Sequence, residues 1–358
     1  MQPHHIEAFC RKGKSITLAA GLAFATISLV TVHQNAGGQS APLHWYKGNT
    51  HTHTTNSDGD TSPPLVAAWY RNNGYDFLYL TDHNKRTGIS EIQKEIDTSN
   101  SLEQRKPFLL IPGEEVTEPW TEGQEKQALH TCGLDTKTVV GKQGGTTKRE
   151  ALQRCVDAIT SAGGLPSVNH PNFMWSLTTD DLYAMKGLRH FEIYNGHPVV
   201  NNYGGGGVPG CEQMWDVLLS RGRLFYGVAV DDAHHYKQFR RDLANPGRAW
   251  VVVRAAELSG KAITAALRDG NFYASTGVEL EDITTTDSRT LGVVIKQLSS
   301  RKFRTEFVGE YSKILATDET MTPSYTLKPN DKYVRAKVTS SNGEFAWTQP
   351  LFASKPSE

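Results

Sequence analysis

Short apolar runs alternate with stretches of helical periodicity from Trp45 to about Gly270. The runs have the length of strands, whereas the stretches between them repeat their apolar residues every three to four positions, as one face of a helix does. Seven runs are predicted as strands: Tyr46–Asn49, Phe77–Thr81, Phe108–Ile111, Ala128–Thr131, Leu165–Val168, Phe191–Tyr194 and Leu224–Val230. The predicted helices are Pro64–Asn72, Ser90–Thr98, Lys148–Ala162, Thr179–Lys186 and Cys211–Arg221.

Boundary signals support this alternation. Thr147 can cap the helix predicted at Lys148–Ala162, and Gly163 follows its end. Strands that are separated by helices pair in parallel, which predicts an α/β fold, either a βα-barrel or a doubly wound sheet. A strand at Ala249–Val253 and a helix near Gly260–Arg268 extend the pattern.

The pattern changes after about Glu279, where short apolar runs are separated by polar turns such as Asn342-Gly343. The runs are Leu291–Ile295, Phe303–Val308, Lys313–Ala316, Tyr333–Val338 and Glu344–Trp347. We therefore predict a small, all-β, sandwich-like C-terminal domain over residues 279–358. Every histidine lies at or before His235, so this region supplies no imidazole ligand and is interpreted as structural or ligand-binding.

Residues 1–41 have the layout of an export signal. Three cations, Arg11, Lys12 and Lys14, precede the apolar run Ile16–Val32, and small polar residues follow it. The run has 17 residues, which is short of the roughly 20 that a membrane span needs. We expect a periplasmic or extracellular protein whose body begins at about residue 42. The alternative is an uncleaved N-terminal anchor, which would be its contact with a membrane.

The charge balance argues against a nucleic-acid partner. Without residues 1–41, the chain has 35 basic and 37 acidic residues. A protein that holds nucleic acid stably needs a basic surplus to neutralise phosphates. The balance excludes nucleic acid only as a stably held partner, not as a substrate, and a small-molecule ester or phosphoester substrate is expected. Cys132, Cys155 and Cys211 form no CxxC pair, and an oxidising compartment would allow at most one disulfide among them.

Histidines and acids gather where the predicted strands end. His51 and His53 follow the first strand, and strand alternation places both side chains on one face. In a barrel, the carboxyl ends of the strands meet on one face. Residues that follow separate strands are therefore expected to form one cluster. The other members of the set are Asp58, Asp82, His83, Glu114, Glu115, His130, His170, Asp232 and His234.

These residue types indicate metal chemistry. Imidazole nitrogen and carboxylate oxygen suit Zn, Mn and Fe, and the set exceeds what one tetrahedral ion needs. Two or three divalent ions are therefore predicted, which would activate a hydroxide for hydrolysis. Taken singly, a His-x-His or Asp-His pair is weak evidence. An alternative of unrelated caps and turns has to explain six such coincidences at successive strand ends.

Several of these motifs together resemble the polymerase and histidinol phosphatase (PHP) superfamily. They are Gly48-Asn49-Thr50-His51-Thr52-His53, Leu80-Thr81-Asp82-His83, Pro112-Gly113-Glu114-Glu115-Val116, His130, Asn169-His170-Pro171 and Asp232-Ala233-His234. The resemblance covers about residues 45–275. It implies a distorted seven-stranded βα-barrel over residues 42–278, with a trinuclear metal site that hydrolyses phosphoesters.

The same resemblance implies three ligand sets. The first ion would take His51, His53, Glu115 and Asp232. The second would share Glu115 with His130 and His170, and the third would take Asp58, His83 and His234. A further combination resembles the secreted branch that contains carbaryl hydrolase: the predicted sandwich together with Trp45-Tyr46-Lys47-Gly48, Ser57-Asp58-Gly59-Asp60 and Trp69-Tyr70-Arg71. Because that enzyme cleaves a carbamate ester, the type of scissile bond stays open.

Further polar residues near the set are candidates for substrate contacts. Arg86 follows His83 and could bind an anionic group of the substrate, with a solvated loop as the alternative. His197 follows the sixth strand and is a candidate proton donor to the leaving group, with a capping or surface histidine as the alternative. Glu192 and Asn195 are expected beside it. Asp231 and His235 are interpreted as residues that orient the ligands.

Three functions follow from these patterns. The leading one is a metal-dependent phosphoesterase that cleaves phosphomonoesters or phosphodiesters. The first alternative is a carboxylic or carbamate ester hydrolase at the same metals. The second, from a different class, is a non-catalytic metal-binding protein.

Overall fold

Among the described residues, nine strands and six α-helices make up the first part of the fold. The protein is described by a computed structural model over residues 42–356, and the predicted export segment lies outside these residues. The strands of this part are β1 (His44–Asn49), β2 (Phe77–Leu80), β3 (Leu109–Glu122), β4 (Glu125–Leu134), β5 (Leu165–Val168), β6 (His190–Asn195), β7 (Tyr226–Val230), β8 (Trp250–Ala255) and β9 (Phe272–Ser275). The helices are α1 (Pro63–Asn72), α2 (Ser90–Glu103), α3 (Lys148–Ser161), α4 (Thr179–Ala184), α5 (Cys211–Ser220) and α6 (Gly260–Arg268).

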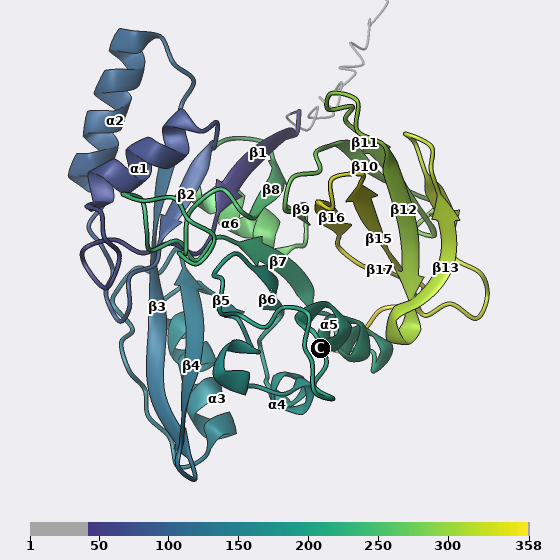
Figure 1. Cartoon of the computed structure of the whole chain (residues 1–358), viewed down its shortest axis with the longest axis horizontal. Coiled ribbons are helices and arrows are strands. Elements are labelled where there is room, and N and C mark those ends of the chain that lie inside the picture. The colour runs from purple at the N-terminus through teal and green to yellow at the C-terminus, as the bar shows by residue number, and fades with distance from the viewer. Residues whose placement is uncertain (1–41, 357–358) are drawn as a thin grey trace, which may run out of the picture. The chain divides into compact units, whose positions relative to one another are not determined.

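Of the strands β1 to β7, six run in parallel with a neighbour. β1, β2 and β3 pair in parallel, as do β5, β6 and β7, whereas β4 is antiparallel to both β3 and β5. The prediction of parallel pairing is therefore wrong for β4. A two-residue turn joins Glu122 to Glu125, with Gly123 at φ +64°, and so short a connection can only join antiparallel strands. Figure 1 shows this long β3–β4 hairpin.

The ring of strands closes between the ends of β1 and β7. Thr52 forms a parallel bridge with Ala233, so the chain just after β1 lies against the chain just after β7. His53 N donates to Ala233 O (3.0 Å) and Asp232 N donates to His51 O (3.1 Å). The earlier part of β1 pairs instead with β8, which runs antiparallel to it. The result is the expected distorted seven-stranded barrel, and its closure lies among the predicted metal ligands.

Burial and capping agree with the sequence pattern. Every residue of β2 and of β5 is buried, as expected for strands covered on both faces. The Thr147 side chain accepts a hydrogen bond from Glu150 N and so caps α3, as predicted. Leu152 and Val156 of α3 join a buried apolar cluster with Leu218 of α5. Helices thereby hold the strands in place and leave their carboxyl ends free to carry polar residues.

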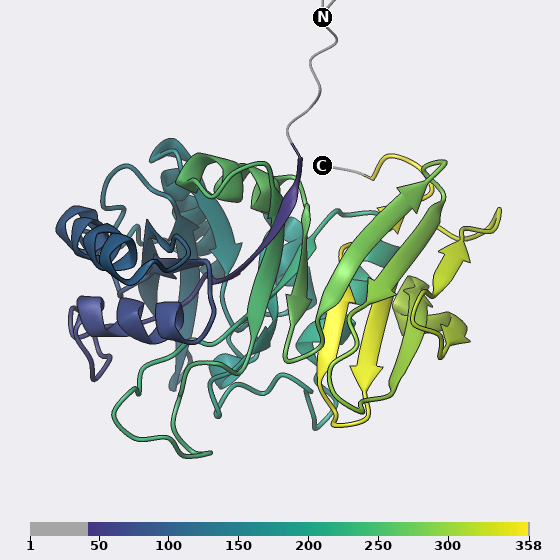
Figure 2. The same cartoon turned by 90° about the horizontal axis from the view of Figure 1, so that it is seen from above.

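Antiparallel strands make up the rest of the chain, as the C-terminal pattern predicts. They are β10 (Leu280–Thr286), β11 (Thr290–Ile295), β12 (Phe303–Gly309), β13 (Lys313–Asp318), β14 (Ser324–Thr326), β15 (Tyr333–Ser340), β16 (Phe345–Thr348) and β17 (Leu351–Phe352). β10, β11 and β14 form a separate sheet. The others continue the large sheet, because β16 pairs with β9 of the first part. Figure 2 shows these strands from above. The domain boundary at residue 279 stays a prediction.

Two smaller predictions concern cysteines and membranes. Within residues 42–356, Cys132, Cys155 and Cys211 are buried free thiols. Over the same residues, the structure contains no helix with the length and apolar character that a membrane crossing requires.

Candidate metal centre

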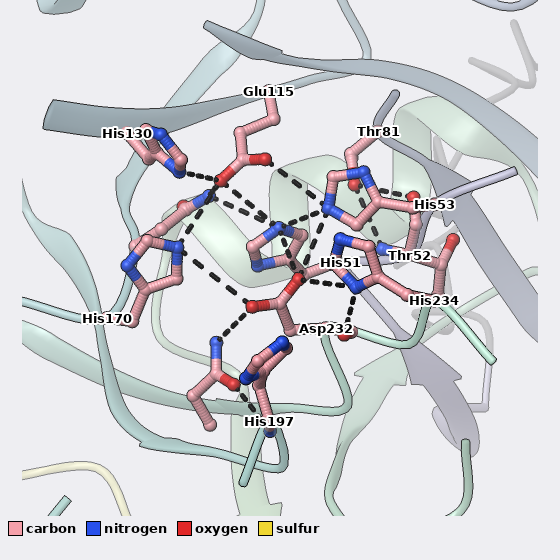
Figure 3. A network of polar contacts seen from close by, with 12 residues as sticks. His51, Thr52, His53, Thr81, Glu115, His130, His170, His197, Asp232 and His234 are labelled. Carbon is pink, nitrogen blue, oxygen red and sulfur yellow. Dashed lines mark hydrogen bonds and ion pairs between the residues drawn. The ribbon is translucent and has the colours of Figure 1, made fainter. Parts of the chain in front are cut away.

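All nine predicted metal ligands lie together, as Figure 3 shows for most of them. Seven line a cavity of about 370 Å³: Asp58, His83, Glu115, His130, His170, Asp232 and His234. His51 and His53 are fully buried and do not line the cavity, but both contact Asp232, which does. The nine side chains therefore form one cluster, as the sequence pattern predicts. The role of each as a ligand stays a prediction.

The first group of ligand atoms surrounds Asp232. His51 Nε2 and His53 Nε2 are 3.1 Å apart, and each lies 3.2 Å from Asp232 Oδ1. The Glu115 carboxylate places one oxygen 3.3 Å from each of these nitrogens. Ligand atoms around one ion with bonds of about 2.1 Å lie about 3.0–3.5 Å apart. The spacing of these four side chains suits a single divalent cation.

The second group meets the first at Glu115, in the middle of β3. His130 Nδ1 lies 2.9 Å from Glu115 Oε1, and His170 Nε2 lies 3.5 Å from the same oxygen. His83 Nδ1 lies 2.7 Å from Glu115 Oε2. The carboxylate therefore lies between two sets of imidazoles, which is the position of a ligand shared by two cations.

The third group is centred on Asp58. Asp58 Oδ1 lies 3.4 Å from His234 Nε2 and 3.5 Å from His53 Nδ1, and its Oδ2 lies 3.4 Å from His83 Nε2. His53 is thus an addition to the predicted set of Asp58, His83 and His234. The Asp58 side chain is 55% exposed, whereas that of His53 is fully buried. This group forms the solvent-facing side of the cluster.

Hydrogen bonds select the ring nitrogens that face the cluster. His51 Nδ1 donates to Glu192 Oε1 (2.7 Å), and His234 Nδ1 donates to Asp232 O (2.8 Å). In a neutral imidazole the other nitrogen, Nε2, then carries the lone pair. In both residues Nε2 points at the ligand atoms described above. The rings are therefore presented in the form that binds metal.

Burial and the contacts between carboxylates and imidazoles shift the pKa values of the cluster residues. Burial alone would raise the pKa of Glu115, but the imidazoles of His130 and His83 hold it well below its usual value. Burial lowers the pKa of His53 to about 4, aided by His234. Burial would also lower the pKa of His83, but Glu115 and Asp58 raise it to about 10. The carboxylates thus remain ionised and provide negative charge to a bound cation.

The donor atoms fit divalent cations. Glu115 Oε2 and His130 Nδ1 are buried and have neighbours at 2.7 and 2.9 Å, yet neither makes a hydrogen bond. Buried polar atoms are normally hydrogen-bonded. Imidazole and carboxylate atoms that converge without bonding one another are expected where a cation completes the site. The residues present therefore suit divalent metal ions.

Local backbone geometry places the last ligands. Asp232 has φ +50°, a conformation that costs a non-glycine residue roughly 1 kcal/mol or more. Its N–H donates to His51 O, which fixes this turn at the barrel closure. Asp82 does not face the cavity. Its carboxylate accepts from Thr54 N (2.8 Å) and Ser57 Oγ (2.9 Å), which fixes the loop that carries Asp58.

Some of the residues predicted to bind substrate or orient ligands line the cavity, and others do not. His197 lines the cavity, and its N–H donates to Asn195 Oδ1. His235 also lines the cavity rather than orienting a ligand. Arg86 does not reach it, because its Nε donates to Thr136 O (2.7 Å) and so binds the backbone. Asp231 likewise contacts no ligand: its carboxylate accepts from Tyr70 OH and from the backbone N–H groups of residues 247–249.

Glu192 has a larger role in the geometry than its sequence position suggested. It is buried behind the ligands, and its Oε2 accepts from His170 N (2.7 Å) and Asn195 Nδ2 (2.8 Å). Asn195 Nδ2 also donates to Asp232 Oδ2 (3.1 Å). The signal in the sequence was a lone acid inside an apolar strand, Phe191-Glu192-Ile193, because a buried acid needs such partners.

Comparisons with known proteins give weak likenesses. No family model and no curated protein matches this chain. A two-domain protein from Bacteroides vulgatus, described as containing a predicted PHP-like metal-dependent phosphoesterase, is 15% identical, with a TM-score of 0.47 over 87% of this chain and 98% of that one. An amidohydrolase from Chromobacterium violaceum is 17% identical, with a TM-score of 0.36 over 55% of this chain and 90% of that one.

A lesion-specific endonuclease from Pyrococcus furiosus is 12% identical, with a TM-score of 0.36 over 64% of this chain and 56% of that one. All three TM-scores lie below 0.5, so none of these proteins carries its activity over to this chain.

Proposed function

We propose that the chain is a metal-dependent hydrolase of the PHP type that cleaves phosphomonoesters or phosphodiesters with two or three divalent ions, Zn, Mn or Fe. One observation carries this proposal: three groups of ligand atoms overlap around one cavity, because neighbouring groups share His53 or His83. A single structural ion needs only one closed group of about four ligands. Overlapping groups that open onto a cavity suit catalysis better than structural support.

The chain's own residues hold and orient the reactants. Bound divalent ions would acidify a water molecule and offset the negative charge that develops on the ester oxygens. Glu115 and Asp232 supply the carboxylate charge that retains those ions, and Glu192 fixes the ring of His51. His197 faces the same cavity and is the proposed proton donor to the leaving oxygen.

Substrate panels test the reaction. The purified chain, loaded with Mn or Zn, should hydrolyse aryl phosphomonoesters or phosphodiesters and lose this activity with a chelator. Aryl acetates and aryl carbamates belong in the same panel. Turnover of these far above the phosphates would replace phosphoester cleavage with carboxylic or carbamate ester cleavage at the same site.

Ligand variants test the site. His53→Ala and Asp232→Asn should each lower kcat by orders of magnitude, because each removes an atom from the first group. The matched control is His190→Gln, since His190 is also a buried histidine but its Nε2 donates to Leu267 O, outside the cluster. Rates like those of the unaltered chain in both ligand variants, with full metal content, would overturn the assignment.

A further inference from the structure

An apolar side chain lies beside the metal ligands. Among the described residues that line the cavity, Phe173 alone is apolar, and the others are acids and histidines. Its ring centroid lies 5.1 Å from that of His170 and 6.2 Å from that of His197. Phe173 is half-buried, so part of its ring faces the cavity. An ester held at the ligands would therefore lie next to an apolar surface.

The two residues that follow Phe173 are also apolar, and both are exposed. Met174 and Trp175 are 46% and 42% exposed, although large apolar side chains are normally buried. Both have left-handed backbone conformations, with φ +53° and +52°. Such strain in non-glycine residues is costly and is concentrated at functional sites. The chain thus accepts strain at two exposed apolar residues that directly follow a residue lining the cavity.

A second segment lies against the first. Asn172 is fully buried, and its Nδ2 donates to Asn201 O (3.0 Å) and Pro209 O (2.9 Å). These bonds fix Phe173 and its neighbours against the segment that begins at His197. That segment carries Val199, which is 56% exposed. Two segments that hydrogen bonds hold together, each with one residue that lines the cavity (Phe173 and His197), therefore both expose apolar side chains.

We propose that Phe173, Met174, Trp175 and Val199 form an apolar subsite, which binds an aryl or branched alkyl group of the ester while the metal ligands hold its charged end. The inference rests on the proposed function and names its substrate class. Continuity with the cavity supports this occupant, because Phe173 belongs to both surfaces. Exposed apolar surface beside polar binding groups is typical of a ligand site.

The test compares two ligands that share an anionic group. Calorimetry with the metal-loaded chain measures the affinities of phenylphosphonate and methylphosphonate. We expect phenylphosphonate to bind about tenfold more tightly, since one aromatic ring gains contact area. Phe173→Ala and Trp175→Ala should bring the two affinities together. Leu65→Ala, at an apolar residue of α1 that is 63% exposed and does not line the cavity, should leave the preference intact.

Affinity for methylphosphonate serves as the internal control for folding and metal content in each variant. Equal binding of the two ligands by the unaltered chain, or an unchanged preference in both variants, would overturn the subsite. Binding of neither ligand would overturn the subsite and the metal-centred function together. A preserved phenyl preference in a protein that hydrolyses no aryl phosphate would reject the proposed chemistry and keep the subsite.

Discussion

At the scale of single residues, one carboxylate connects the ligand groups to each other. Glu192 binds the ring of His51 and the backbone of His170, and through Asn195 it reaches Asp232. Such carboxylate–histidine contacts fix a ligand's tautomer and raise its basicity. Glu192 is therefore a positioning residue that acts through the ligands.

The substitution Glu192→Gln tests this role. The amide keeps the shape of the side chain but loses the charge that orients His51. We expect metal affinity, measured by chelator competition, to fall about 10- to 100-fold. At saturating metal, kcat should recover partly, because all ligands are still present. Full activity at trace metal would contradict the role.

Asp231→Asn is the matched control. Asp231 is as deeply buried as Glu192, but its carboxylate accepts from Tyr70 OH and from backbone N–H groups instead of contacting a ligand. Its substitution should lower the free energy of unfolding and leave the metal affinity within a few-fold of the original. An equal loss of metal affinity in both variants would show that burial, not the contact to His51, causes the effect.

A buried histidine outside the cluster makes stability depend on pH. Burial lowers the pKa of His190 to about 4, because its ring lies among Tyr226 and Phe272 with Nδ1 unpaired. The unfolded chain takes up this proton near pH 6.5 and the folded chain only near pH 4. Its contribution to the free energy of unfolding is therefore complete above pH 6.5 and falls as pH drops towards 4, by up to about 3 kcal/mol.

His190→Gln isolates this contribution, because glutamine can donate to Leu267 O but does not titrate. Urea unfolding at pH 7 and pH 4.5 should show a smaller loss of stability on acidification for the variant. If the free energies of unfolding of the variant and the unaltered chain differed by the same amount at both pH values, the prediction would be contradicted.

At the scale of elements, local sequence patterns predicted where strands and helices lie, but they did not predict the direction of one strand. The predicted strand Leu165–Val168 and the start of the helix at Lys148 agree with the structure, because periodicity and capping act over a few residues. The predicted direction of β4 was wrong, because the turn before it, Gly123-Gln124, is not one of the strong hairpin signals. His130 consequently lies within β4, opposite Thr117, instead of at a strand end.

The predicted ligands nevertheless lie together, because β3 extends past Glu115 and the chain returns as β4. Glu115 and His130 therefore lie on two adjacent, antiparallel strands, and their side chains contact each other. Arg86 does not line the cavity, and its contact with an anionic group of the substrate stays a prediction. Its position depends on a contact with Thr136, 50 residues later, which no local pattern indicates.

The loop after β1 gives a prediction at this scale. Asp58→Asn should remove one equivalent of bound metal and leave the others, because Asp58 is the only carboxylate in its group and is more than half exposed. Metal analysis after gel filtration measures this. Asp60→Asn is the control, since the Asp60 carboxylate accepts from Tyr236 N and belongs to none of the three groups. Unchanged stoichiometry in Asp58→Asn would remove the third site.

At the scale of the whole described chain, the C-terminal strands are joined to the first part more closely than the sequence pattern predicts. Strand pairing between β9 and β16 links residues about seventy positions apart, and no local pattern encodes such a partner. A second link lies between β15 and α5. Arg335 is almost completely buried there, although arginine is rarely buried without a partner.

This link is an ion pair with good geometry. Arg335 Nε and Nη2 each donate to one oxygen of Asp216 at 2.7 Å, and Nη2 also lies 2.9 Å from Glu212. Arg335→Leu leaves the Asp216 charge buried without its main partner, so the free energy of unfolding should fall by about 3–5 kcal/mol. The double variant Arg335→Leu/Asp216→Leu should lose less than the sum of the two single changes, since it leaves neither charge unpaired.

Urea unfolding, followed by tryptophan fluorescence and by far-ultraviolet circular dichroism, measures both quantities. The ion pair joins α5 of the first part to β15 of the C-terminal strands, so the two parts should unfold together. The fluorescence and circular dichroism signals should then change in one transition for the unaltered chain. Arg335→Leu should move that transition to lower urea without splitting it, since the pairing of β9 with β16 remains. Two separate transitions in the unaltered chain would show that the C-terminal strands are an independent domain, as the sequence pattern alone suggests. Additive losses in the double variant would show that the ion pair does not couple the two parts.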